Sequence, residues 1–236
     1  MIKLLAFDLD GTLTQHKSPL GEENKAVLNK LAEKYKLLMV GAGSCARIHK
    51  QLGNYPIDII GNYGLQFYTY DKETGGLTAV RNLHFPVERE SVEARVTALR
   101  AKHGFTSFVG ENVEFHESGA VTIPLLGTKA ELADKLVFDP DKSRRKKIYD
   151  EVKALFSEYV VFVSGTSSFD MVPSPYDKYY ALDLYCKEHG IAHDEVIFVG
   201  DDYGEGGNDE SVYRSDFGFI CMDDYTKLGE RLAELL

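Results

Sequence analysis

The sequence predicts an α/β protein built on a parallel sheet, with a second, α+β domain inserted into it. Residues 2–9 form a near-continuous apolar run, which is typical of a strand buried on both faces. Strand-like and helix-like segments then alternate over the first 60 residues, as they do in parallel α/β sheets. Hairpin signals interrupt this alternation, and it resumes near residue 179.

The first part of the chain supplies three of the expected parallel strands. The expected strands are 2–9, 37–40 and 57–60, and the expected helices are 19–34 and 47–52. Helix 19–34 carries Val27, Leu28 and Leu31 on one stripe, the pattern of a helix that packs on a sheet. Gly11 ends the first strand, and a turn of small residues at 41–44 follows the second.

The middle of the chain reads as antiparallel hairpins with two helices. Expected hairpins pair 65–70 with 77–80, 113–117 with 121–126, and 159–163 with 168–172, and expected helices are 87–102 and 142–157. The basic run at 142–147 opens the second of these helices and is interpreted as a solvated face. Helix 179–189, strand 196–199, helix 211–213, strand 217–221 and helix 225–236 complete the chain. We therefore predict a core of residues 1–80 and 172–236, and an inserted α+β domain at 81–171.

Composition excludes several classes of protein. With 44% hydrophobic residues among 236, the chain is expected to fold, and no apolar run approaches the roughly 18 residues needed to cross a bilayer. A net charge of -10 argues against sequence-independent nucleic-acid binding. Cys45, Cys186 and Cys221 are too few and too far apart for a disulfide framework or a zinc site. The expected protein is cytoplasmic and acts on a small molecule, without nucleic-acid or membrane partners.

Two aspartates stand at the end of the first buried strand. Asp8 and Asp10 are spaced i and i+2, so on a continuing strand their side chains point the same way. Ligands of open α/β sheets bind at the carboxyl ends of the strands. Buried carboxylates need a compensating charge, for which a hard cation is the natural partner.

A second acidic cluster follows the last expected core strand. It begins at Asp201 and ends at Asp209, with three glycines between them. If the first and fourth strands are neighbours, Asp8, Asp10 and Asp201 converge, and Mg²⁺ suits such an oxygen-only site. Each cluster alone could simply form turns or cap helices, but two clusters, each after a buried strand, favour an active site.

These residues resemble the haloacid dehalogenase (HAD) superfamily of phosphotransferases. The resemblance is carried by Asp8-Leu9-Asp10-Gly11-Thr12 and by Gly200-Asp201 with Asn208-Asp209. The sequence is further similar to eukaryotic-type phosphomannomutases within that superfamily at residues 38–44, 61–65, 168–173 and 176–182. The resemblance implies a Rossmann-like HAD core with an inserted C2-type cap domain that determines substrate specificity.

The resemblance also implies roles for core residues. Asp8 is the expected nucleophile, Asp10 the general acid and base, and Lys178 the lysine that screens the transferring phosphate. Mg²⁺ is expected on Asp8 and Asp201, with the backbone carbonyl of Asp10 and with Asp209. On the residues alone, Lys178 is more simply a solvated lysine.

Phosphate and substrate ligands are expected around this centre. The predicted phosphate-binding residues are Thr12, Gly43 and Ser44, with backbone amides of the 41–44 turn as an alternative to Ser44. The predicted substrate-binding residues are Asn62, His116, Thr128, Asp170 and Asn208. Asn62 and Asp170 are equally consistent with turn formation.

One departure from the phosphomannomutase pattern decides between two activities. Those mutases use cap arginines to hold the distal phosphate of a hexose bisphosphate, and the matching positions here are His116, Thr128 and Lys135. We therefore predict a Mg²⁺-dependent phosphohydrolase that acts on a small phosphorylated metabolite, a hexose phosphate, through an aspartyl-phosphate. A phosphomannomutase is the alternative, since Arg81, Arg100 or Lys129 could bind the distal phosphate in place of the missing arginines. A homodimer through the cap is a further expectation.

Overall fold

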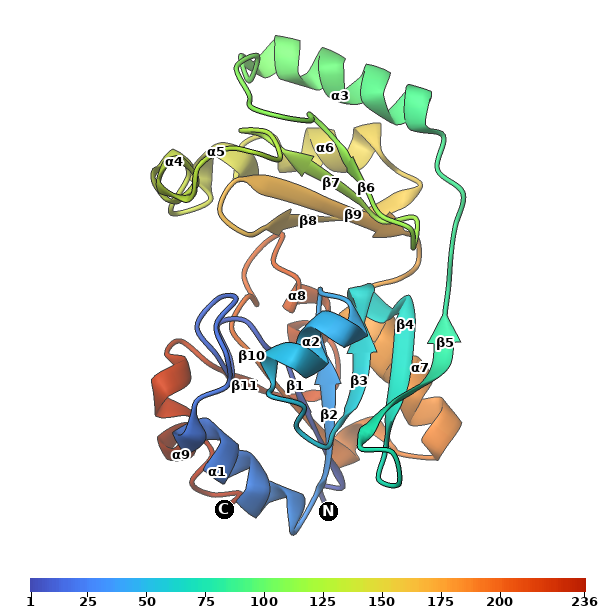
Figure 1. The fold of residues 1–236 in the computed structure, drawn as a ribbon, viewed down its shortest axis with the longest axis vertical. Helices are drawn as coiled ribbons and strands as arrows, with labels where there is room; N and C mark the ends of the chain where they lie inside the picture. The colour runs from blue at the N-terminus through green and yellow to red at the C-terminus, as the bar shows by residue number, and fades with distance from the viewer. The chain divides into compact units, whose positions relative to one another are not determined.

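The computed structural model describes residues 1–236, which divide into two compact units (Figure 1). The first unit comprises Met1–Leu83, Asp177–Gly204 and Asp209–Leu236, and the second comprises His84–Tyr176 and Glu205–Asn208. The division thus lies three to five residues beyond the predicted boundaries at 81 and 171. The grouping of Glu205–Asn208 with the inserted part was not predicted.

The first unit is built on a seven-stranded sheet with the order β11-β10-β1-β2-β3-β4-β5. Its strands are β1 (Leu4–Phe7), β2 (Lys36–Val40), β3 (Asp58–Gly61), β4 (Gln66–Asp71), β5 (Gly76–Asn82), β10 (Val196–Gly200) and β11 (Gly218–Cys221). The strands from β11 to β3 pair in parallel, and β4 and β5 add antiparallel to the edge beyond β3. The predicted parallel sheet is confirmed, and β1 lies between β10 and β2.

Helices cover both faces of this sheet. They are α1 (Glu22–Ala32), α2 (Cys45–Gln51), α7 (Lys178–His189), α8 (Glu210–Tyr213) and α9 (Leu228–Arg231), with short 3-10 turns η1 (Asn62–Gly64), η2 (His193–Glu195) and η3 (Tyr225–Lys227). Leu5 and Phe7 of β1 pack in the apolar cluster that includes residues of α1, α2 and α9. Leu4 and Ala6 pack in the cluster that includes residues of α7 and α8. This alternation explains why β1 is apolar at every position.

The second unit is a four-stranded antiparallel sheet with the order β6-β7-β9-β8. Its strands are β6 (Glu114–Phe115), β7 (Val121–Pro124), β8 (Tyr159–Ser164) and β9 (Ser168–Pro173), and its helices are α3 (Arg89–His103), α4 (Leu132–Phe138), α5 (Ser143–Lys146) and α6 (Tyr149–Leu155). Val96 of α3 and Val152 of α6 pack with Val121, Phe169 and Met171 of the sheet. Helix α4 was not predicted.

None of the helices in either unit combines the length and the apolar character needed to cross a bilayer.

The predicted helix at 142–157 is interrupted, and its basic run is not uniformly solvated. Helix α5 ends at Lys146 and α6 starts at Tyr149, because Ile148 between them has φ -112° and ψ 3°. Arg145 is completely buried, with its Nε 2.8 Å from Oδ2 of the equally buried Asp139. Its Nη1 also donates to the backbone carbonyls of Ser164 and Ser168. This arginine joins α5 to the turn between β8 and β9.

We expect Arg145→Ala to destabilise the second unit by about 3–5 kcal/mol, because it leaves the Asp139 carboxylate buried without its cation. Lys146→Ala, an exposed position on the same helix, is the matched control and should change the free energy of unfolding by less than about 0.5 kcal/mol. Urea unfolding followed by circular dichroism measures both. Equal stabilities of the two variants would contradict the structural role of Arg145.

Candidate active site

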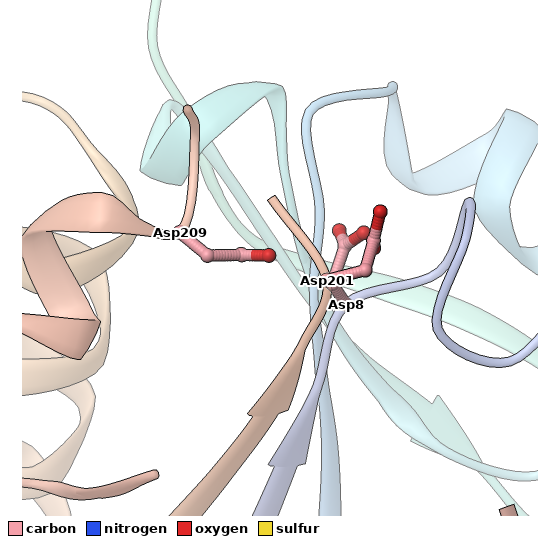
Figure 2. Close-up of side chains that lie close together, drawn as sticks. All are labelled: Asp8, Asp201 and Asp209. Atoms are coloured by element: carbon pink, nitrogen blue, oxygen red, sulfur yellow. The ribbon is translucent and has the colours of Figure 1, made fainter. Parts of the chain in front are cut away.

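Three aspartates meet at the carboxyl ends of two neighbouring strands of the first unit. Asp8 follows β1 and Asp201 follows β10, and these strands pair in parallel. Asp209, next to the start of α8, completes the group: one carboxylate oxygen from each residue lies within 4.8 Å of the others. Figure 2 shows the Asp209 side chain pointing towards the Asp8 and Asp201 carboxylates. The predicted convergence of Asp8 and Asp201 therefore occurs.

Glycines make room for two of these carboxylates. A Cβ atom at Gly11 would overlap the Asp201 carboxylate, and Gly11 has a φ of 99°, which favours glycine. A Cβ atom at Gly200 would lie 2.5 Å from Oδ2 of Asp209. The glycine of the Asp-Gly pair after β1 is thus required both by the turn and by the close approach of Asp201.

Lys178 supplies a buried positive charge between two of the aspartates. It is the first residue of α7, whose N-cap Asp177 accepts a hydrogen bond from the Tyr180 amide. The Lys178 side chain is completely buried, and its Nζ lies 2.6 Å from Oδ1 of Asp8 and 2.7 Å from Oδ1 of Asp209. The interpretation of Lys178 as a solvated lysine is therefore wrong.

The electrostatics of this group combine burial with charge. Burial alone would lower the pKa of Lys178, but the charges of Asp209 and Asp8 outweigh it and raise that pKa, so the ammonium keeps its proton. Burial raises the pKa of Asp8 well above its usual range, opposed by Lys178 and reinforced by Asp209 and Asp201. Burial and the neighbouring Asp209 raise the pKa of Asp201 to about 6.

The group fits a divalent cation. Three carboxyl groups face a single ammonium here, so acidic groups are in excess, and burial makes an uncompensated negative charge costly. The candidate ligand atoms are all carboxylate oxygens, which Mg²⁺ and Ca²⁺ prefer, and the group contains no histidine or cysteine. Asp8 and Asp201 are the better placed ligands, because both oxygens of Asp209 already accept hydrogen bonds, from Lys178 and from the Asp202 amide.

Thr12 contacts this group directly. Its buried hydroxyl donates to Oδ1 of Asp201 at 2.8 Å. Thr12, predicted to bind phosphate, therefore orients a carboxylate in this structure.

Asp10 lies apart from the three aspartates. Its Oδ1 accepts hydrogen bonds from the Lys17 amide and from Gln51, and its Oδ2 accepts one from Arg47. The two-residue periodicity that placed Asp8 and Asp10 on one side does not apply, because β1 ends at Phe7 and a turn follows. A role of the Asp10 backbone carbonyl as a metal ligand stays a prediction.

The hydrogen bonds that the Asp10 carboxylate accepts change its pKa. Burial works to raise the pKa of Asp10, but hydrogen bonds from Gln51 and Lys17 and the charge of Arg47 together lower it. Sequence reasoning missed Arg47 and Gln51. Their i and i+4 spacing on the helix after the 41–44 turn was the available signal.

The 41–44 turn packs beside the loop that follows β3. Ser44 is the N-cap of α2, and its hydroxyl accepts from the Arg47 amide at 3.3 Å. The Asn62 amide donates to the Gly43 carbonyl at 2.8 Å, which places Asn62 beside the turn. Burial raises the pKa of Cys45 to about 12, as expected for a structural thiol.

The predicted substrate residues of the second unit fall in three places. His116 Nε2 lies 3.0 Å from the Thr122 hydroxyl, which in turn donates to Asp170 at 2.8 Å. Thr122 and Asp170 lie on the sheet face opposite to Val121 and Met171, which pack under the helices. The Thr128 hydroxyl instead accepts from the Glu111 amide in a loop, and Asn208 lies in the Glu205–Asn208 segment.

Comparisons with known proteins point to one family. A model of the family described as eukaryotic phosphomannomutase matches residues 24–222. The phosphomannomutase of Saccharomyces cerevisiae is 28% identical over 221 residues, covering 89% of this chain and 84% of its own. Phosphomannomutase 1 of Homo sapiens is 26% identical, covering 89% of this chain and 82% of its own.

Solved structures show similar folds. The IMP-bound Plasmodium falciparum IMP-nucleotidase mutant has a TM-score of 0.72 at 16% identity, covering 99% of this chain and 68% of its own. A phosphatase of the HAD superfamily from Bacteroides thetaiotaomicron has a TM-score of 0.67 at 16% identity, covering 100% of this chain and 95% of its own.

We expect proton competition at the aspartate group. Because a cation binds the deprotonated carboxylates, protonation of Asp201, with its pKa of about 6, should weaken Mg²⁺ binding as the pH falls. The Kd for Mg²⁺ should be about tenfold higher at pH 5 than at pH 7.5, measured by isothermal titration calorimetry. Asp201→Asn is the control and should bind Mg²⁺ weakly at both pH values. A Kd of the unsubstituted chain that does not change with pH would contradict the assignment.

Proposed function

The chain belongs to the eukaryotic phosphomannomutase family and has the fold of the HAD superfamily, and from this premise we propose that it is a Mg²⁺-dependent enzyme of phosphoryl transfer that forms an aspartyl-phosphate on Asp8. The observation that carries the proposal is the buried Lys178, held between Asp8 and Asp209 beside Asp201. A buried cation next to a strand-end carboxylate is suited to a nucleophile that must approach an anionic phosphate.

The proposed reaction has two chemical steps. An oxygen of the Asp8 carboxylate attacks phosphorus, the bond from phosphorus to the leaving oxygen breaks, and Asp10 gives its proton to that oxygen. A water molecule then attacks the phosphorus of the aspartyl-phosphate, returns a proton to Asp10, and releases phosphate and the Asp8 carboxylate. Mg²⁺, when bound to Asp8 and Asp201, would supply positive charge next to the phosphate oxygens.

Phosphate contacts in the first unit would come from the 41–44 turn. The Cys45 amide already donates to Gln66 and the Arg47 amide to Ser44. The amides of Gly43 and Ser44 are therefore the better candidates, which favours backbone groups over the Ser44 hydroxyl. Thr12 would act through Asp201, to which its hydroxyl donates.

The arginines of the second unit support a hydrolase that acts on a monophosphate. A mutase needs a second cationic group that binds the distal phosphate of a sugar bisphosphate. All five arginines between 84 and 176 instead contact other groups of this unit. Arg89 and Arg144 lie over the rings of Phe115 and Phe138, Arg95 pairs with Glu158, Arg100 donates to the carbonyls of Leu125 and Pro124, and Arg145 pairs with Asp139. We therefore prefer hydrolysis of a small phosphorylated metabolite such as a hexose phosphate, with His116, Asp170, Asn62, Thr128 and Asn208 as proposed substrate residues.

Phosphomannomutase activity is the second candidate, and the family match favours it. The chain would then interconvert mannose 6-phosphate and mannose 1-phosphate, as the names of its relatives suggest. Arg81, which lies three residues before the second unit in the sequence, pairs with Glu188.

A homodimer through the second unit is also part of the proposal. Leu132, Leu136 and Val137 on α4 expose more than half of their surface, an unusual share for three apolar side chains on one short helix.

Replacing the nucleophile tests the proposed chemistry. We expect Asp8→Asn to lower phosphate release by at least about 10³-fold with the fold intact, because an amide cannot form the acyl phosphate. Asp194→Asn, the same change on the surface turn η2, is the matched control. EDTA should also abolish turnover by the unsubstituted enzyme. Full activity of Asp8→Asn, or activity unaffected by EDTA, would refute the mechanism.

Competing assays on one substrate separate the two activities. With mannose 1-phosphate and a catalytic amount of hexose bisphosphate, we expect phosphate release to be faster than formation of mannose 6-phosphate. Isomerisation faster than phosphate release would establish the mutase instead. Tight binding of sugar phosphates without either reaction would indicate a binding protein that keeps the fold.

A further inference from the structure

We propose that Gln51 and Arg47 are positioning residues that hold the Asp10 carboxylate so that one oxygen, Oδ2, faces the substrate. The inference deepens the proposed function, in which Asp10 moves the proton. Neither residue was expected from the sequence, and both lie on α2, the helix that follows the 41–44 turn.

The two oxygens of Asp10 have different numbers of donors. Oδ1 accepts from the Lys17 amide at 2.7 Å and from Gln51 Nε2 at 2.6 Å. Oδ2 accepts from Arg47 Nη1 at 3.2 Å. Since a carboxylate oxygen offers about two lone pairs, Oδ1 is saturated and Oδ2 keeps one acceptor position. The proton that Asp10 transfers is therefore carried by Oδ2.

Gln51 is itself held from three sides. Its Oε1 accepts from Arg47 Nη1 at 2.8 Å, and its Nε2 donates to the hydroxyl of the buried Thr14 at 3.0 Å as well as to Asp10. These contacts determine the orientation of the amide, so that its Nε2 faces Asp10. Arg47 is one helical turn before Gln51 and lies against Gly43, where a Cβ atom would overlap its guanidinium.

The position of Asp10 explains why such support is needed. Asp10 lies beyond the end of β1 in a turn, so the pleat of the strand does not determine where its side chain points. The Lys17 amide contributes one backbone contact, and the remaining two contacts come from α2. A general acid that is displaced by about 1 Å loses much of its effect, which makes these side chains part of the proton-transfer geometry.

The dependence of the rate on the leaving group tests this inference. When a sugar phosphate reacts, the sugar departs as an alkoxide, which needs the proton from Asp10. When p-nitrophenyl phosphate reacts, p-nitrophenolate departs, and it is stable enough to leave without that proton. The value of kcat/KM reports the steps up to phosphorylation of Asp8, so later hydrolysis of the aspartyl-phosphate does not enter it. The sugar phosphate used is the one on which the unsubstituted enzyme is most active.

We expect Gln51→Leu to lower kcat/KM for the sugar phosphate by about 10- to 100-fold and for p-nitrophenyl phosphate by less than about 3-fold. Asp10→Asn should show the same selectivity with a larger loss. Lys50→Ala, an exposed neighbour on α2, is the matched control and should change neither value. Activity on p-nitrophenyl phosphate shows in the same experiment that Gln51→Leu is folded.

The outcomes separate this inference from the proposed function. If Gln51→Leu loses equal activity on both substrates, or loses none on either, the positioning role is wrong. A selective loss for Asp10→Asn would still support Asp10 as the general acid in that case. An Asp10→Asn variant without selectivity, or an unsubstituted enzyme inactive on both substrates, would overturn the proposed function and this inference with it.

Arg47→Leu distinguishes positioning from direct contact with phosphate. We expect a smaller selective loss than for Gln51→Leu, because the contact of Arg47 with Asp10 is longer. A uniform rise in KM for both substrates would mean that Arg47 binds the phosphate, and would restrict the positioning role to Gln51.

Discussion

The site depends on one buried interaction, that of the Lys178 ammonium with Asp8 and Asp209. Lys178 and Asp209 have no side-chain surface exposed to bulk solvent, so each is compensated by the groups packed around it. Removing the lysine would leave two carboxylates facing each other, and removing Asp209 would leave Lys178 with Asp8 alone. The segments around 8, 178 and 209 must therefore fold together, and the same constraint places a cation beside the carboxylate that is proposed to attack phosphorus.

The parallel sheet explains how distant segments reach this interaction. β1 and β10 are neighbours, so the residues that follow them, Asp8 and Asp201, emerge at one edge although 193 positions separate them. Close approach then depends on the lack of side chains at Gly11 and Gly200, where a Cβ atom would collide with Asp201 and Asp209. The clustered aspartates and the glycines beside them are thus parts of a single packing arrangement.

The sequence was sufficient to predict the parallel sheet, because buried strands and the residues at their ends have strong local patterns. It predicted the meeting of Asp8 with Asp201 on the condition that their strands are neighbours, which the structure shows them to be. It was insufficient for Arg145 and for the position of Asp10, and Lys178 was expected at the site only through the family resemblance, not from its own local pattern. The burial of Lys178 and Arg145 depends on partners elsewhere in the fold, and a lysine or arginine in an acidic protein is usually solvated. Asp10 was misplaced since a two-residue period was extended past the end of the strand. Arg47 and Gln51 reach Asp10 from α2, a helix whose orientation the sequence does not reveal.

The arginines of the second unit make contacts within that unit, and this affects which substrates the unit can bind. Arg100 and Arg145 are buried and donate to backbone carbonyls at the ends of β7 and β8, so they are committed to these turns. The face of the sheet opposite to Val121 and Met171 instead carries the hydrogen-bonded series His116, Thr122 and Asp170. Such groups exchange hydrogen bonds with hydroxyls more readily than they compensate a second phosphate. This distribution of charge supports the proposal that the substrate is a sugar with a single phosphate.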